Sequence, residues 1–309
     1  MRRRLRNQVM TAVAVGCVAL LVNGCEAHVS GAPPATDRPQ APAVTPPASL
    51  PAIPEAPPAP PAAPFDGLDA RVSQAAADAA ASSGADIKTA VLDRTTGQVA
   101  SIRADQPFPL ASVVKLFIAD DLLLQESRGE TELSAADRET LDIMLRSSDD
   151  SAAQMFWDRS GQNAIIARIV DRYGLTGTTA PANGKWDVTQ STASDLVRYY
   201  DMLLDGAGGL PPEQAEVIIG NLAQATPTGT DGYPQRFGIP DALSGEPVAF
   251  KQGWFCCWNG GNQLHVSTGV IGPERRYVMA ISSLDPVGAA AARENITQAV
   301  RTMFPGGRI

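Results

Sequence analysis

Residues 108–115 read FPLASVVK, and this stretch places Ser112 three residues before Lys115. Apolar residues at helical spacing follow as far as Gly129, so we expect a helix that begins near Ser112. Residues three apart lie on the same face of a helix, and the amine of Lys115 can therefore approach the hydroxyl of Ser112. A neighbouring base of this kind activates a serine for nucleophilic attack. Taken alone the spacing is not specific, because a helix-capping serine and a surface lysine give the same pattern.

Two more short strings follow in order, SDD at residues 148–150 and KQG at residues 251–253. With Ser112 and Lys115 they resemble the three active-site motifs S-x-x-K, S-D-N and K-T-G of the penicillin-recognising serine enzymes, which are the class A β-lactamases and the penicillin-binding proteins. The strings FPLA and VAF, which precede the first and third motifs, are also similar to that family. The resemblance covers nearly all of residues 66–309.

The resemblance implies a role for each matched residue. Ser112 would be the nucleophile and Lys115 its base, while Ser148 would relay a proton towards the leaving nitrogen. Ser148 also precedes an expected helix, so it could serve as a helix cap as well. Lys251 would bind a substrate carboxylate, or would otherwise be an exposed lysine on a strand. The backbone N–H groups of Ser112 and Trp254 would form the oxyanion hole.

Two residues of the expected substrate site depart from the family pattern, whereas Gly253 matches it. Asp150 stands where the family has an asparagine that donates to the substrate amide, and an ionised aspartate can only accept. A carboxylate about 4 Å from the Lys115 amine contributes roughly 4 kcal/mol at an effective dielectric of 20. Lowering the pKa of a lysine to neutrality requires about the same free energy. Asp150 could therefore keep Lys115 charged, unless Asp150 pairs with Lys251. Gln252 stands where the family has threonine or serine and lacks their compact hydroxyl.

The third departure from the family pattern is a missing glutamate. Class A β-lactamases carry a glutamate on a loop after the helical block, where it activates the deacylating water, but residues 175–191 contain no glutamate. Asp187 is the only acid in this stretch and belongs to a WDVT string that is typical of the structural end of the loop. Efficient β-lactam hydrolysis is therefore not expected. Peptidase-like chemistry remains compatible, because penicillin-binding peptidases also lack this glutamate.

The order of the expected elements predicts the architecture. Helices are expected over residues 66–83, 112–129, 134–144, 151–158, 163–173, 192–204, 212–223 and 288–303, and strands over residues 87–92, 98–103, 248–255, 264–271 and 277–283. Strands from both ends of the domain would pair in one antiparallel sheet, with a helical block at about residues 130–225 inserted between them. The prediction is an α/β (α+β) fold, which the resemblance makes β-lactamase/transpeptidase-like, with a five-stranded antiparallel sheet flanked by helices.

The first 64 residues predict export and tethering. Four arginines precede a mostly apolar run over residues 9–22, which is too short to span a bilayer, so we expect an export signal over residues 1–24. The string VNGC resembles a bacterial lipobox in which Cys25 is lipidated; an ordinary cleaved signal with an incidental cysteine is the alternative. Residues 25–64 are rich in proline and alanine, which favours an extended spacer or, alternatively, an arm embedded in the cell wall.

The folded domain is expected over residues 65–309, anchored by the lipid to the outer face of the cell membrane, as in actinobacterial envelope lipoproteins. The net charge of −8 becomes more negative once the arginine-rich leader is removed, which argues against nucleic-acid binding. With two histidines, of which His28 lies in the tether, we expect no metal site and no cofactor. A Ser-His-Asp triad would rest on His265 alone. The oligomeric state stays open.

Cys256 and Cys257 follow directly after the oxyanion position and could form a vicinal disulfide in an oxidising compartment. Adjacent Cα atoms are about 3.8 Å apart across a trans peptide, which is shorter than the usual disulfide span, so free thiols are slightly favoured. Trp254, Phe255 and Trp258 make this segment aromatic. Their rings either pack under the sheet edge or cover and narrow the cleft.

Two functional hypotheses follow. The first is a membrane-anchored serine hydrolase that acts weakly, or on specialised substrates, on peptidoglycan-like peptides or β-lactam-like compounds through Ser112 and Lys115. The second is a degenerate relative that binds or scaffolds a peptide ligand without turnover. Asp150 and Gln252 are the residues that separate the two hypotheses.

Overall fold

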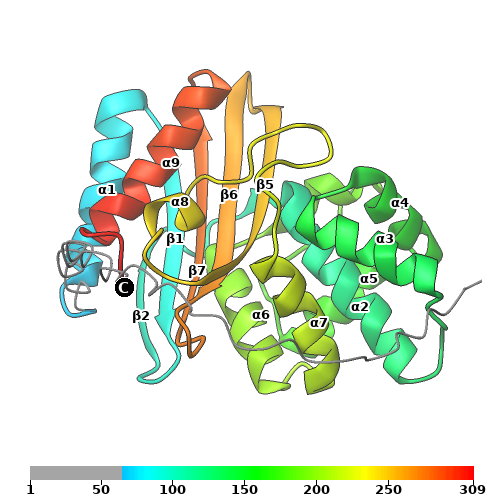
Figure 1. Cartoon of the computed structure of the whole chain (residues 1–309). Coiled ribbons are helices and arrows are strands. Elements are labelled where there is room, and N and C mark those ends of the chain that lie inside the picture. Colours follow the sequence, from blue (N-terminus) through cyan, green and yellow to red (C-terminus); the bar gives the residue numbers. More distant parts are fainter. Residues whose placement is uncertain (1–64) are drawn as a thin grey trace, which may run out of the picture. The chain divides into compact units, whose positions relative to one another are not determined.

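The computed structural model describes residues 65–309 (Figure 1), so the expected leader, Cys25 and the tether lie outside the described residues. The helices are α1 (Leu68–Ser83), the 3₁₀ helix η1 (Ala111–Val114), α2 (Lys115–Ser127), α3 (Ala135–Arg146), α4 (Asp150–Arg159), α5 (Asn163–Tyr173), the 3₁₀ helix η2 (Trp186–Val188), α6 (Ala193–Asp205), α7 (Pro212–Ala223), α8 (Ile239–Ala242) and α9 (Ala289–Met303). The strands are β1 (Asp86–Asp93), β2 (Gln98–Ile102), β3 (Phe108–Pro109), β4 (Gln190–Ser191), β5 (Val248–Trp258), β6 (Asn262–Ile271) and β7 (Tyr277–Asp285).

Five of the strands form one antiparallel sheet in the order β2-β1-β7-β6-β5. The first two strands of the domain join the last three because β1 pairs with β7 along its whole length. The predicted five-stranded antiparallel sheet with inserted helices is therefore confirmed. β5, which carries the KQG motif, lies at the edge of the sheet that faces the helical layer (Figure 1).

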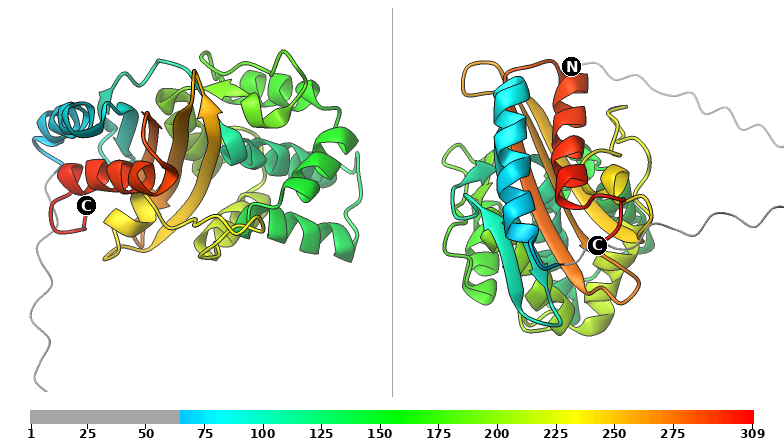
Figure 2. Two further views of the ribbon diagram at one scale, coloured as in Figure 1. Left: turned by 90° about the horizontal axis from the view of Figure 1, so that it is seen from above. Right: turned by 90° about the vertical axis from the view of Figure 1, so that its left-hand side faces the viewer.

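Helices cover both faces of the sheet. α1 and α9 lie side by side on one face (Figure 2), and their apolar residues share a buried cluster with β1, β6 and β7. α6 and α7 pack against the other face, and the remaining helices of the block pack around α2 in a second and larger cluster. None of the helices between residues 65 and 309 is long and apolar enough to cross a membrane.

α2 is buried on all sides over its first ten residues, which include acids as well as apolar side chains. Asp120 is fully buried and pairs with Arg172 on α5. It also accepts hydrogen bonds from the hydroxyls of Tyr173 and Tyr199. These contacts tie α5 and α6 to α2, and α2 in turn supports η1 and Ser112 at its own N-terminal end.

Most expected element boundaries lie within three residues of the observed ones. Ser134 caps α3 as expected, through a capping box with Asp137. The helix expected to begin near Ser112 instead starts with the tighter 3₁₀ turn of η1. The short elements β3, β4, η2 and α8 were not expected, because two to four residues are too few to show a periodic pattern.

We predict that Asp120→Ala lowers the free energy of unfolding by about 3 kcal/mol, because it leaves Arg172 and two tyrosine hydroxyls buried without their partner. Urea unfolding of the full chain measures the loss. Asp241→Ala is the matched control, since it breaks an exposed pair with Arg301 and should cost less than about 1 kcal/mol. Equal losses in the two variants would contradict the role given to the buried network.

Candidate active site

The three motifs meet at one place between β5 and the helical layer. Ser112 lies on η1, Ser148 lies just before α4, and Lys251 lies on β5. The Nζ atom of Lys115 is 2.7 Å from Ser112 Oγ, and the Nζ atom of Lys251 is 2.7 Å from Ser148 Oγ. The structure thus brings together the hydroxyls and amines that the sequence analysis expected to converge.

Gly253 allows the edge strand to pass directly against η1. A Cβ atom at this position would lie 2.4 Å from the carbonyl oxygen of Leu110 and 3.3 Å from the backbone nitrogen of Ser112. No side chain fits in that space. The third motif residue is therefore a glycine for a steric reason. Because Gly253 has no side chain, β5 can lie directly beside the candidate nucleophile, Ser112.

Two residues next to the site have backbone conformations that non-glycine residues rarely adopt. Ala111 has a φ of 47° and Ser148 a φ of 59°. Such residues cost on the order of 1–3 kcal/mol each and persist only where the surroundings hold them. At Ser148, the carbonyl accepts from Lys115 Nζ at 2.6 Å while the hydroxyl accepts from Lys251. The cap of α4 is Asp149 and not Ser148, which leaves the Ser148 hydroxyl to the two lysines.

Lys115 is completely buried and has polar partners on three sides. Its amine donates to Ser112 Oγ, to the Ser148 carbonyl and, at 2.6 Å, to Asp150 Oδ1. It also lies 4.9 Å from the centre of the Trp186 ring. Burial lowers the pKa of Lys115 and the Asp150 carboxylate raises it, with a net decrease below 10.5. The carboxylate is 73% exposed, so water screens its charge and burial is the stronger of the two effects.

Lys251 is also buried, with 1% of its surface exposed, which excludes the alternative of an exposed strand lysine. Burial, together with the neighbouring charge of Lys115, lowers the pKa of Lys251 well below its usual range. Within residues 65–309 no ion pair joins Lys251 to Asp150, so the expected compensation between these two residues is not formed. Its one close partner from another element is the Ser148 hydroxyl.

Gln252 does not lie beside a substrate position. Its buried amide donates to the carbonyls of Gln235 at 3.0 Å and Phe237 at 2.7 Å. Neighbouring residues of a strand point to opposite sides, so the Lys251 side chain reaches Ser148 while Gln252 reaches the segment before α8. The expectation that Gln252 replaces a substrate-contacting hydroxyl is therefore corrected: its side chain anchors residues 235–237.

His265 lies apart from the candidate nucleophile. Its Nε2 atom is hydrogen-bonded to the Tyr233 hydroxyl at 2.7 Å, and its ring packs edge-on against Phe237. Burial lowers the pKa of His265 to about 3. No Ser-His-Asp triad is formed among the described residues, and no group of three or more His, Cys, Asp or Glu side chains there is placed to hold a metal ion.

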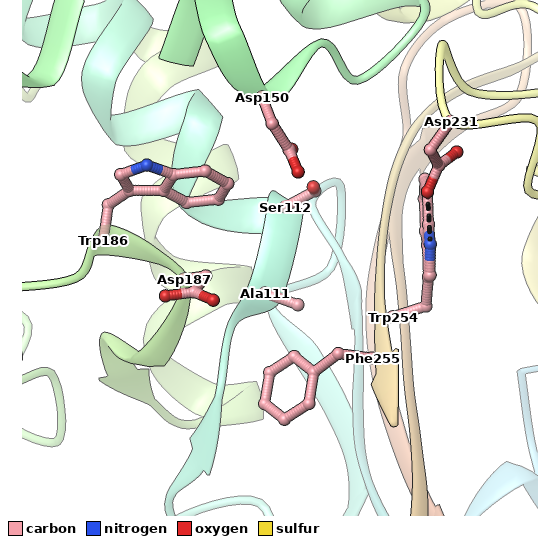
Figure 3. A pocket seen from close by; sticks show the side chains of 8 residues that line it. All are labelled: Ala111, Ser112, Asp150, Trp186, Asp187, Asp231, Trp254 and Phe255. Carbon is pink, nitrogen blue, oxygen red and sulfur yellow. Dashed lines mark hydrogen bonds between the residues drawn. The ribbon is translucent and has the colours of Figure 1, made fainter. Parts of the chain in front are cut away.

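A cavity of about 270 Å³ opens above Ser112 (Figure 3). It is lined by Ala111, Ser112, Asp150, Trp186, Asp187, Asp231, Trp254 and Phe255. Trp186 and Asp187 stand on one side and Trp254 and Asp231 on the other (Figure 3). The sequence predicts a structural loop end at Asp187 and gives no sign of Asp231, which lies in a Gly-Thr-Asp-Gly turn with no pattern that marks a site.

The aromatic segment at the end of β5 contributes directly to the cavity. Trp254 and Phe255 line it, while Trp258 packs against Phe255 with ring centres 5.7 Å apart. Cys256 and Cys257 are joined in a vicinal disulfide, which differs from the free thiols that the sequence slightly favoured. The peptide bond between the two cysteines is cis, and their Cα atoms are 3.0 Å apart.

We predict that Lys251→Met changes how stability depends on pH. The pKa of Lys251 is lowered in the folded state from 10.5, so between the two values the unfolded chain holds more protons and stability rises with pH. The wild type should therefore gain stability relative to Lys251→Met as the pH rises towards 10.5, the ordinary pKa of a lysine, as measured by urea unfolding. Lys185→Met, at an exposed lysine, is the control and should leave the pH dependence unchanged. A difference in the free energy of unfolding between the wild type and Lys251→Met that stays the same at every pH would contradict a lowered pKa of Lys251 in the folded state.

Comparison with known proteins gives a consistent result. Residues 70–138 and 136–304 match the beta-lactamase enzyme family. The chain is 55% identical over 317 residues to a Mycobacterium tuberculosis protein named "Putative lipoprotein LppW", and the match covers 97% of this chain and 98% of the relative. A Mycobacterium bovis protein of the same name matches equally well.

Solved structures of similar fold include PBP-A, with a TM-score of 0.63 and 19% identity over 79% of this chain and 97% of that chain. A beta lactamase from Xanthomonas campestris gives a TM-score of 0.62 and 20% identity over 76% of this chain and 97% of that chain. At these identities the likeness concerns the fold alone. The sequence matches decide the relationship: this chain belongs to the beta-lactamase enzyme family.

Proposed function

We propose that this protein is an envelope-anchored serine enzyme that transfers or hydrolyses acyl groups of peptidoglycan-like peptides or β-lactam-like compounds. The single observation that carries the proposal is the 2.7 Å contact between Lys115 Nζ and Ser112 Oγ at the base of a cavity, with the lysine buried and its pKa lowered. A lysine amine is a base only when it is neutral, so a lowered pKa is what this chemistry requires. Membership in the beta-lactamase enzyme family supports the same reaction class.

The acylation step uses groups already in place. Neutral Lys115 takes the proton of Ser112 Oγ as this oxygen attacks a carbonyl carbon, and the backbone N–H groups of Ser112 and Trp254 stabilise the negative oxygen that forms. Ser148 Oγ lies 3.5 Å from Lys115 Nζ and 2.7 Å from Lys251 Nζ. This chain of contacts supports a proton transfer through Ser148 to the leaving nitrogen.

Release of the acyl group is proposed to be slow. Residues 175–191 contain no glutamate, and the carboxylate that this stretch places at the cavity is Asp187. We therefore do not propose an efficient class A β-lactamase.

Anchoring at the membrane is part of the proposal. The name of the 55% identical relatives describes them as lipoproteins, and the VNGC string of this chain fits lipidation at Cys25. Residues 25–64 would then hold the domain away from the outer face of the cell membrane. Four charged residues at the start and an apolar run before Cys25 support export of the chain.

A second function, binding or scaffolding without turnover, is favoured by one specific contact. Asp150 Oδ1 lies 2.6 Å from Lys115 Nζ, where it stabilises the protonated lysine. A protonated Lys115 holds the Ser112 hydroxyl by donating to it and cannot accept its proton. Acyl transfer thus requires a neutral Lys115 amine, whereas binding without turnover is compatible with a protonated one.

We predict that a neutral fluorophosphonate labels Ser112 of the full chain in detergent, with a new Oγ–P bond, loss of fluoride, and transfer of the serine proton to Lys115. Labelling should be absent in Ser112→Ala and about 100-fold slower in Lys115→Met, as measured by intact mass. Ser82→Ala, at an exposed serine of α1, is the control and should label as the wild type does. Labelling that survives in Ser112→Ala would refute the assignment of the nucleophile.

We predict further that Asp150→Asn moves the pH profile of this labelling to lower pH. Asp150 raises the pKa of Lys115, so its removal lets Lys115 lose its proton at lower pH, and the rate at neutral pH rises. The measurement is the labelling rate across the pH range for both proteins. A profile that moves to higher pH would contradict the assignment of Lys115 as the base. A wild type that stays unlabelled while Asp150→Asn is labelled would instead establish the binding or scaffolding function.

A further inference from the structure

The connection between α7 and α8 contacts the chain that leads into the second motif. The backbone N–H of Thr226 donates to the carbonyl of Arg146 at 3.0 Å, and the backbone N–H of Thr230 donates to the carbonyl of Ser147 at 2.8 Å. These two carbonyls belong to the residues directly before Ser148. The position of Ser148 therefore depends on a segment that lies far from it in the sequence.

Gln235 strengthens this contact with a buried side chain, of which 1% is exposed. Its Nε2 atom lies 2.9 Å from the carbonyl oxygen of Arg146 and 3.0 Å from that of Thr226. A side-chain amide nitrogen carries two N–H donors, so Gln235 can serve both carbonyls at once. Gln235 thus joins the connection to the C-terminal end of α3.

Gln252 holds the same connection from the third motif. Its Nε2 atom donates to the carbonyls of Gln235 at 3.0 Å and Phe237 at 2.7 Å. The threonine or serine that the family has at this position is shorter and carries a single O–H donor, so it cannot serve both carbonyls. A buried carbonyl without a donor is costly. The departure from the family pattern at Gln252 therefore meets a requirement of residues 235–237.

Ser148 needs support from its surroundings. Its φ of 59° is a conformation that a non-glycine residue keeps only where neighbouring contacts hold it. Its hydroxyl lies between two buried amines, 2.7 Å from Lys251 Nζ and 3.5 Å from Lys115 Nζ. A change in the backbone of residues 146–147 moves this hydroxyl relative to both amines.

We propose that Gln235 and Gln252 are positioning residues, which act through the carbonyls before Ser148 and hold its hydroxyl where it can pass a proton to a leaving nitrogen. The inference rests on the proposed function for the proton transfer itself. It assigns Gln252 a part in the reaction, although its side chain is directed away from the candidate nucleophile. The family's threonine at this position should therefore weaken the proton transfer in this protein.

Two probes separate the proton transfer from the attack by Ser112. Benzylpenicillin forms a bond between Ser112 Oγ and the β-lactam carbonyl carbon, and the ring C–N bond breaks. Lys115 takes up the serine proton, and Ser148 passes a proton to the leaving nitrogen, which departs poorly without one. A neutral fluorophosphonate forms an Oγ–P bond and releases fluoride, which needs no proton from Ser148. The ratio of the penicillin rate to the fluorophosphonate rate therefore measures the proton transfer.

We expect this ratio to fall about tenfold in Gln252→Thr and in Gln235→Met, in the same direction as in Ser148→Ala. Intact mass of the full chain in detergent measures both rates, and labelling by the fluorophosphonate shows that each variant is folded. Gln74→Met, at an exposed glutamine that donates to Asp78 on α1, is the control and should keep the ratio. An unchanged or higher ratio in either glutamine variant would overturn the proposal. A wild type that is labelled by the fluorophosphonate alone would overturn it as well.

A second measurement separates this inference from the proposed function. If neither probe labels the wild type, the proposed acyl transfer fails, and nuclear magnetic resonance of ¹³C-labelled lysine side chains in Gln235→Met then tests the positioning alone. Within residues 65–309, Gln235 has no hydrogen bond with Lys115 or Lys251. Lysine signals that move towards their positions in Ser148→Ala support the inference. Signals that stay at the wild-type positions, or move away from those of Ser148→Ala, overturn it.

Discussion

The burial of the Lys115 amine against the Ser112 hydroxyl is the constraint on which the site depends. The Lys115 side chain is 0% exposed, and its amine is held by groups from η1, the start of α4 and η2. Three elements around the amine are fixed in turn: α2 by the Asp120 network, η1 by its close approach to Gly253, and the start of α4 by Asp149. The fold therefore keeps a costly buried amine where it can serve chemistry, at the junction of sheet and helices.

A second consequence is an unequal sharing of charge. Two buried lysines flank the single hydroxyl of Ser148, but only Lys115 has a carboxylate partner. Lys251 has none, so burial and the neighbouring positive charge both favour its neutral form. The remaining acids of the site, Asp187 and Asp231, line the cavity, and the charge of Asp231 acts on both lysines. The lining of the cavity thus carries three carboxylates, while the two lysines lie buried behind Ser112 and Ser148.

The parts of this arrangement that could be predicted from sequence are the local ones. Apolar periodicity located the strands and helices, and the three motif strings located Ser112, Lys115, Ser148 and Lys251. What could not be predicted depends on contacts between distant segments. Motif position alone predicts Gln252 beside the substrate, whereas the carbonyls of Gln235 and Phe237 decide where its amide lies. Asp231 reaches the cavity from a turn with no periodic pattern.

The central claim is that Lys115 gives up its proton more readily than an ordinary lysine while it touches Ser112. Nuclear magnetic resonance of ¹³C-labelled lysine side chains, with the Lys115 signal assigned from Lys115→Met, measures this pKa directly in the wild-type protein. The account predicts a titration midpoint below 10.5, the ordinary value for lysine. A midpoint at or above 10.5 would mean that Asp150 outweighs burial, and it would contradict Lys115 as the base and the catalytic account built on it.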